Sequence, residues 1–196
     1  MKLIKNTPFF KNNGKTFLFL HIPKSGGTAY RQTFLSKSQV DGHNNHGHLN
    51  LQQINERWPY EYKNSFKYTI KRNDYDRFIS WFNRAVKGHR SKQYEEIFKK
   101  YNFKKHIDAF RFFRDYEWLN KDARSFIHVR PNDFFLNDKI DFIIEYDNFQ
   151  KDINRLHKKI NLPQKKVAKI RASIYDIKIS EKEELEMKNY FNNIKL

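Results

Sequence analysis

The chain lacks cysteine altogether, and it has little glycine, little proline and no long apolar run. The absence of cysteine excludes disulfides and thiolate metal sites. Cysteine content therefore does not indicate whether the protein resides in an oxidising or a reducing compartment. No stretch approaches the roughly 20 apolar residues of a membrane-spanning helix. Residues 1–17 contain lysines but no continuous apolar segment of the kind found in secretory signals. We therefore expect a cytoplasmic protein without a membrane span.

Positive charge and aromatic side chains are present in excess. The 39 lysines and arginines against 22 acidic residues give a net charge of +17, which favours an anionic partner. Nucleic acid, acidic polysaccharide, anionic lipid and phosphorylated small molecules all fit. A lysine-rich surface produced by an AT-rich genome is the alternative without functional meaning. The length of 196 residues fits one domain spanning 1–196.

Strand and helix patterns alternate along the chain. Short apolar stretches at 16–22, 66–71 and 139–146 predict strands. Helices are predicted at 28–37, at 49–58, where Pro59 stops the helix, and at 92–120. Another is capped by Asn73 or Asp74 and ends near Val86, and one more is capped by Asp147. The last helix is opened by the capping-box pair Ser180 and Glu183. In the helix ending near Val86, Phe78, Trp81, Phe82 and Ala85 share one apolar face, and Arg77, Ser80 and Arg84 lie on another. Residues 36–48 and 128–136 are expected to be loops. This order predicts an α/β fold with a small, mostly parallel central sheet flanked by helices. In such sheets ligands bind at the carboxyl ends of the strands, where the 23–28 loop and the 72–74 turn are expected to lie.

The stretch HIPKSGGTAY (21–30) follows the first predicted strand and opens a helix. Gly26 and Gly27 permit positive φ and close backbone approach, so their N–H groups and the helix start favour an anion. Thr28 adds a hydroxyl and Lys24 a positive charge. In a Walker A loop the lysine follows the glycines, whereas here it precedes them. The order argues against a nucleotide kinase of P-loop type, which stays as an alternative, as does a tight turn with no ligand.

Several segments resemble one family, the carbohydrate sulfotransferases. HIPKSGGTAYRQTF (21–34) resembles their 5′-phosphosulfate loop, H-I-P-K-T-G-G-T-S, and YTIKRNDYDRFISWFNRA (68–85) resembles their 3′-phosphate segment. GHNNHGHLNLQQI (42–54) is similar to the H-G-H segment of the heparan sulfate 2-O-sulfotransferase group. HVRPNDFFL and DFIIEYDNFQKDINRL resemble later segments, so the resemblance runs from about residue 17 to about residue 160.

The resemblance implies a P-loop-like three-layer fold and a donor, 3′-phosphoadenosine 5′-phosphosulfate, whose sulfuryl group moves to a carbohydrate hydroxyl by in-line displacement without a metal. It assigns the donor's bridging oxygen and 5′-phosphate to Lys24, and the 5′-phosphate cradle to Ser25, Gly26, Gly27 and Thr28. Arg72 and Ser80 are expected to hold the 3′-phosphate, and His48 or His46 to act as general base. Asp74 stands where the family has proline, and Asn132 where it has glutamine.

Other interpretations of the same residues stay open. His43, His46 and His48 are also spaced for a metal, or lie solvated in a loop, and His21 is expected to pack at a strand end. A basic nucleic-acid-binding protein without enzymatic activity, and a sulfotransferase-like fold that has lost activity, are the further alternatives. The tail 169–175 offers Arg171 or Ser173 to the 3′-phosphate. The basic residues at 99–114 are expected to form solvated helix faces, with a secondary role in binding an acidic saccharide through Lys104, Lys105, Arg111 and Arg114.

Overall fold

The computed structural model describes residues 2–4, 7–34, 48–86, 92–115, 124–167 and 178–193. The chain divides into two compact units, one formed by Met1–Arg72 and Asn132–Ile170 and the other by Asn73–Pro131 and Arg171–Leu196. The expectation of a single domain over 1–196 stays a prediction, and each unit is described by itself.

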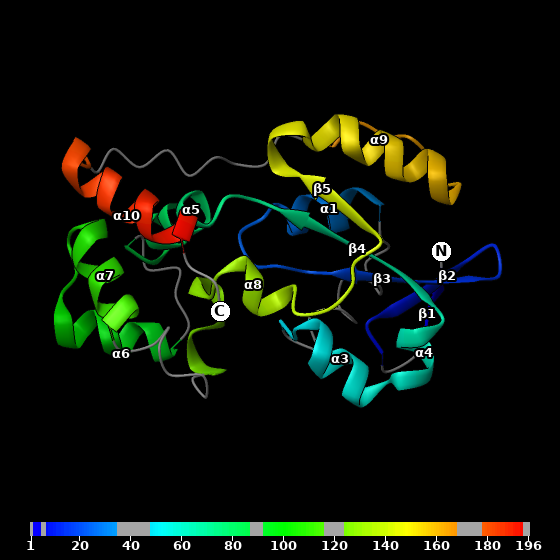
Figure 1. Cartoon of the computed structure of the whole chain (residues 1–196), viewed down its shortest axis with the longest axis horizontal. Coiled ribbons are helices and arrows are strands. Elements are labelled where there is room, and N and C mark those ends of the chain that lie inside the picture. The colour runs from blue at the N-terminus through cyan, green and yellow to red at the C-terminus, as the bar shows by residue number, and fades with distance from the viewer. Residues whose placement is uncertain are drawn as a thin grey trace. The chain divides into compact units, whose positions relative to one another are not determined.

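The first unit is an open sheet with helices on both faces (Figure 1). Its strands are β1 (Lys2–Leu3), β2 (Phe9–Asn12), β3 (Lys15–Leu20), β4 (Ser65–Lys71) and β5 (Phe142–Glu145), in the order β1-β2-β3-β4-β5. Its helices are α1 (Gly27–Phe34), α3 (Leu51–Arg57), α4 (Pro59–Lys63), α8 (Asn132–Phe135), the 3-10 turn η3 (Tyr146–Asn148) and α9 (Phe149–Ile160). The predicted α/β class is confirmed.

The central part of the sheet is parallel, as predicted. β3 pairs with β4 and β4 with β5 in parallel, while β1–β2 and β2–β3 are antiparallel. Apart from the two-residue β1, the described sheet is therefore mostly parallel. The β2–β3 hairpin was missed. Its signal was the Asn13-Gly14 pair, whose φ angles of +48° and +76° form the tight turn that such pairs favour.

Side-chain alternation along β3 builds two cores. Phe17 and Phe19 face α1 and α9, where they pack with Tyr30, Ile153 and Leu156. Leu18 and Leu20 are equally buried but point to the opposite face, because successive side chains alternate along a strand. In Figure 1, α3 and α4 (cyan) lie on the side of the sheet away from α9 (yellow). The strand is buried on both faces, which explains its continuous apolar sequence.

The second unit is helical and has an aromatic core. It contains α5 (Asp74–Val86), α6 (Lys92–Tyr101), α7 (His106–Phe113), the 3-10 helix η2 (Arg124–Val129) and α10 (Glu181–Asn193). The predicted apolar face of α5 is confirmed, since Phe78, Trp81, Phe82 and Ala85 are all buried. Ser180 and Glu183 form the predicted capping box of α10: Glu183 accepts from the Ser180 backbone N–H at 3.0 Å and donates its own to Ser180 Oγ at 3.4 Å.

Three local predictions were wrong, and a fourth was incomplete. The helix expected over 92–120 is interrupted at Asn102, whose φ of +47° is not helical, and α7 begins only at His106. The predicted stop at Pro59 is confirmed, since α3 ends at Arg57, but Pro59 also opens α4, where proline's missing N–H costs nothing. The expected loop 128–136 contains α8 and the end of η2. Asp147 lies in the turn η3, and the N-cap of α9 is Asn148, without a side-chain hydrogen bond.

Candidate functional site

The turn between β3 and α1 has an unusual backbone. Lys24 has a φ of +64° and Gly26 a φ of +90°, whereas Ser25 between them does not have a positive φ. Alternation of this kind turns successive backbone N–H groups toward one side and makes a concavity suited to an anion. Gly26 also opens α1, because its carbonyl oxygen accepts from the Ala29 N–H at 3.1 Å. The positive end of the helix therefore begins at this turn.

The second glycine serves packing against His21. A Cβ added to Gly27 would lie 2.3 Å from His21 Cδ2, so no larger residue fits without displacing the imidazole. The His21 ring also stacks on Phe19, with centroids 6.1 Å apart. His21 is thus a packed residue at the end of β3, and it requires glycine at the first position of α1.

Of the predicted cradle residues, Ser25 is fully buried and Thr28 is exposed. Ser25 Oγ has no hydrogen-bond partner among the described residues. A buried hydroxyl without a partner costs about 1–3 kcal/mol, so such groups usually mark strain or a site that a ligand or water completes. The sequence did not single out Arg31, a buried cation on α1. Burial lowers the pKa of its guanidinium.

His48 lies against the end of β3. Its Nδ1 is 3.2 Å from the carbonyl oxygen of His21, and the two imidazole centroids are 4.8 Å apart. A carbonyl oxygen only accepts, so Nδ1 carries the proton of the neutral ring and Nε2 carries the lone pair. His46 and His43 lie outside the described residues, as do Arg171 and Ser173.

Arg72 directly follows β4, next to the strand that carries the lysine turn. Its guanidinium lies over the Tyr146 ring, 4.5 Å from the centroid, and its Nε is buried without a hydrogen-bond partner among the described residues. Asn132 donates to the Arg72 carbonyl oxygen at 2.8 Å and so fixes the end of the strand. Tyr146 was missed, although its position directly after β5 matches that of Arg72 after β4.

Ser80 and the unexpected Asp74 belong to α5 in the second unit. Asp74 pairs with Arg77 at 2.6 Å, and Arg77 also donates to the Arg130 carbonyl oxygen at 3.0 Å. Arg77, expected on the polar face of the helix, is therefore buried. Asn73 is the residue that caps α5, since its Oδ1 accepts from the Tyr75 N–H at 2.9 Å. The carboxylate of Asp74 is consequently neutralised within its own helix.

A buried hydrogen-bond chain holds α1 against the sheet. Pro163 O only accepts, so His157 Nδ1 donates to it at 2.8 Å, and His157 Nε2 accepts from the Tyr30 hydroxyl at 3.0 Å. The Tyr30 oxygen is left to accept from Tyr68, 3.1 Å away on β4. Burial raises the pKa of Tyr30 and lowers that of His157, so both stay neutral. The chain ties the helix behind the lysine turn to β4 and α9.

Comparisons with models of protein families, with curated proteins and with solved structures find no match. Among the described residues, no three His, Asp or Glu side chains are arranged to hold a metal ion. None of the described helices is long and apolar enough to cross a membrane.

Proposed function

We propose that this chain is a sulfotransferase with a P-loop-like fold, which moves the sulfuryl group of 3′-phosphoadenosine 5′-phosphosulfate to a carbohydrate hydroxyl. The observation that carries the proposal is the turn after β3, where Lys24 and Gly26 both have positive φ immediately before a helix. Lysine rarely adopts this conformation, at a cost of about 1–2 kcal/mol. Strain at a turn that also favours an anion supports a binding role.

The first unit offers polar groups at the same end of its parallel strands, where ligands bind in open α/β sheets. The Lys24 turn follows β3 and Arg72 follows β4, which are neighbours in the sheet. Ser25 Oγ and Arg72 Nε are buried without hydrogen-bond partners among the described residues, and bound phosphate oxygens would satisfy them. These features fit a nucleotide that carries a phosphate at each end.

Each residue has a distinct role in this proposal. The nucleotide supplies the activated sulfuryl group. Lys24 neutralises the negative charge that develops on the leaving phosphate oxygen, an effect of about 3–4 kcal/mol for a preorganised donor. The N–H groups of Ser25, Gly26, Gly27 and Thr28 hold the 5′-phosphate. Arg72 holds the 3′-phosphate with its planar guanidinium, which can bind two oxygens at once. The expected contribution of Ser80, which lies on α5 in the other unit, stays a prediction.

His48 is the proposed general base. Its hydrogen bond to His21 O leaves the lone pair on Nε2, which is the state needed to take a proton from an acceptor hydroxyl. Because His46 lies outside the described residues, its competing assignment as the base stays a prediction.

The melting temperature in the presence of nucleotides tests the proposal. A ligand that binds only the native state raises it, so 3′-phosphoadenosine 5′-phosphate should stabilise the protein, whereas ATP with Mg²⁺ and single-stranded DNA should not. Lys24→Ala should lose the shift, and Lys63→Ala, which removes an exposed lysine from α4, should keep it. A shift with ATP and Mg²⁺ alone would instead support a kinase, and one with DNA alone a nucleic-acid-binding protein.

A further inference from the structure

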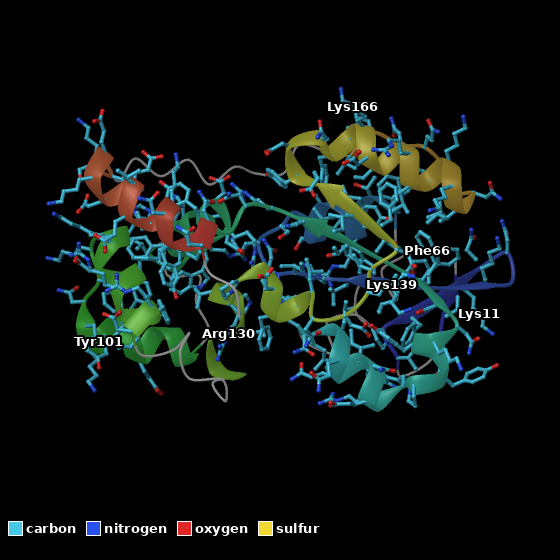
Figure 2. All side chains as sticks on the ribbon, viewed as in Figure 1. Lys11, Phe66, Tyr101, Arg130, Lys139 and Lys166 are labelled. Atoms are coloured by element: carbon cyan, nitrogen blue, oxygen red, sulfur yellow. The ribbon has the colours of Figure 1, made fainter. Side chains whose placement is uncertain are left out.

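The outer side of α9 and the segment after it carry a continuous set of positive charges. We name this set the α9 basic surface: Lys151, Arg155, Lys158, Lys159, Lys165 and Lys166, all of which are exposed. Positions 151, 155 and 158 are spaced by four and three residues, which places their side chains on one side of the helix. The side chain of Lys166, labelled in Figure 2, points outward beside α9.

Arg155 is the one member of this set that pairs with a described acid. The only acidic residue between 149 and 167 is Asp152, which is buried and accepts from the Glu145 N–H at 3.1 Å and from Arg155 at 3.0 Å. None of the five lysines forms an ion pair with a described residue. The exposed acids Glu145 and Asp147 precede the helix at its amino end.

The basic helices of the second unit are different. Arg111 and Arg114 both pair with Glu186, at 2.6 and 3.3 Å, and Arg114 also pairs with Asp115. Lys99 pairs with Glu95 at 3.1 Å. The arginines that the sequence suggested for an acidic saccharide are thus used in ion pairs within their own unit, whereas the five lysines of the α9 basic surface form no ion pair with a described residue.

The surface is broad because the segment after α9 is fixed beside it. Gln150 donates to the Lys165 carbonyl oxygen at 3.2 Å and accepts from the Val167 N–H at 2.9 Å. Figure 1 shows this orange segment running along α9. Two rows of cations therefore lie side by side, one on the helix and one on the extended segment.

We propose that the α9 basic surface docks the protein onto an anionic lipid bilayer. Clusters of four to eight lysines and arginines on an amphipathic helix are typical of such attachment. The apolar side of α9, including Ile153 and Leu156, is buried in the core, so the contact is made by charge and not by insertion. Five of the six cations are lysines, whose flexible point charges suit a diffuse negative field, whereas bidentate phosphate recognition uses arginine.

Nucleic acid fits this surface less well. A helix flanked by a second segment is too broad for the major groove, which is about 12 Å wide. Single strands bind by stacking on aromatic rings, yet the rings beside the surface, Phe66 and Phe142, are half-buried under Lys159 and Arg155, 5.2 and 5.8 Å from their centroids. The inference is independent of the proposed sulfotransferase activity, because it uses none of the residues of that site.

Co-sedimentation with vesicles tests the proposal. The protein should bind vesicles of phosphatidylcholine mixed with phosphatidylglycerol, should not bind phosphatidylcholine alone, and should be released by high salt. Each lysine near an anionic bilayer is worth about a fivefold gain in partitioning, so Lys151→Glu, Lys158→Glu and Lys165→Glu together should reduce binding by more than about a hundredfold. Glutamine at the same positions should give a smaller loss. Arg155 is left unchanged because it pairs with Asp152.

A matched control carries the same change of net charge elsewhere. Lys63→Glu, Lys104→Glu and Lys139→Glu replace exposed lysines outside the surface and should retain most of the binding. Circular dichroism of both variants checks folding. An equal loss in both variants would overturn the proposal, since net charge alone would then explain the binding. A failure of the wild type to bind the anionic vesicles would also overturn the proposal. If the α9 change then abolished binding of duplex DNA or of an acidic polysaccharide, that polymer would be the partner instead.

Discussion

His48 Nδ1 lies 3.2 Å from the carbonyl oxygen of His21, at the end of the strand that leads into the lysine turn. The two imidazoles are in edge contact, with centroids 4.8 Å apart. The residue proposed as general base is therefore anchored to the strand that presents the proposed nucleotide-binding turn. The anchor also selects the tautomer with its lone pair on Nε2.

Replacing His48 separates anchoring from proton transfer. In His48→Asn the side-chain amide can still donate to His21 O, but it cannot take a proton. We expect this variant to melt close to the wild type, to bind 3′-phosphoadenosine 5′-phosphate normally and to lose about 10²–10⁴-fold in sulfuryl transfer. Transfer at the wild-type rate would remove His48 as the base and leave His46 as the candidate.

Lys24 combines a strained backbone with a proposed role in the reaction, so its replacement by glycine should separate the two. Glycine adopts a φ of +64° without penalty, and the relief should equal or exceed the extra entropy of the unfolded chain. We expect Lys24→Gly to be roughly 0–1 kcal/mol more stable in urea unfolding and to lose about 10²–10³-fold in turnover. A fully active glycine variant would show that the lysine ammonium plays no part in the reaction.

Gly27 and His21 should be energetically coupled. Gly27→Ala places a Cβ against the imidazole, and overpacking of this kind costs about 1–3 kcal/mol. His21→Ala removes the obstacle, so the double variant should be more stable than the sum of the two single changes predicts. Urea unfolding of all four proteins measures the coupling. Strictly additive costs would mean that the contact does not determine the choice of glycine.

Tyr146 should strengthen recognition of the 3′-phosphate through Arg72. Its ring lies 4.5 Å from the guanidinium, and such contacts are worth about 0.5–2 kcal/mol. We expect Tyr146→Leu to weaken binding of 3′-phosphoadenosine 5′-phosphate by a few-fold to about thirtyfold, without weakening adenosine 5′-phosphate, which lacks the 3′ group. Arg72→Gln should abolish the preference between the two nucleotides. An equal loss for both would instead indicate a general structural role.

The stability of the protein should fall in mild acid because of two buried histidines. Burial lowers the pKa of His106 to about 4 and also lowers that of His157. In the unfolded chain both titrate near 6.5, so below that pH the unfolded state binds more protons and is favoured. Their contribution is complete above about pH 6.5 and is lost as the pH falls toward the folded-state values.

The size of this effect can be measured on His106, which donates to Asn83 at 2.7 Å. Between about pH 7 and about pH 5 it should cost on the order of 2 kcal/mol. His106→Gln keeps a donor for Asn83 but does not titrate, so its urea midpoint should depend less on pH. An unchanged dependence would assign the acid sensitivity to other groups.

The elements that the sequence predicted well are those with a strong apolar period or a buried run, such as β3, β4 and the α5 face of Phe78, Trp81 and Phe82. The misses have local physical causes. Asn102 breaks a helical pattern by adopting a left-handed conformation that composition does not reveal. For the cap of α5 the sequence left Asn73 and Asp74 as alternatives. The structure selects Asn73, while Asp74 pairs with the buried Arg77.

The sequence predicted where the candidate residues lie in the fold better than it predicted what surrounds them. Lys24 and Arg72 follow two neighbouring parallel strands, as the strand–turn–helix pattern and the carboxyl-end rule suggested. The use of Gly27 against His21, the burial of Ser25 and the Tyr30–His157 hydrogen bond could not be predicted, because they depend on contacts between segments distant in the sequence or on local backbone geometry. The basic period of α9 was visible in the sequence, but whether its charges were compensated was not.

Calorimetric titration with 3′-phosphoadenosine 5′-phosphate, performed on the wild type and on Lys24→Ala, tests the central claim most directly. The account predicts saturable one-to-one binding by the wild type and a loss of at least about tenfold in affinity for the variant, because a charge-assisted contact to a phosphate is removed. No binding by the wild type, or equal affinity in both proteins, would contradict it.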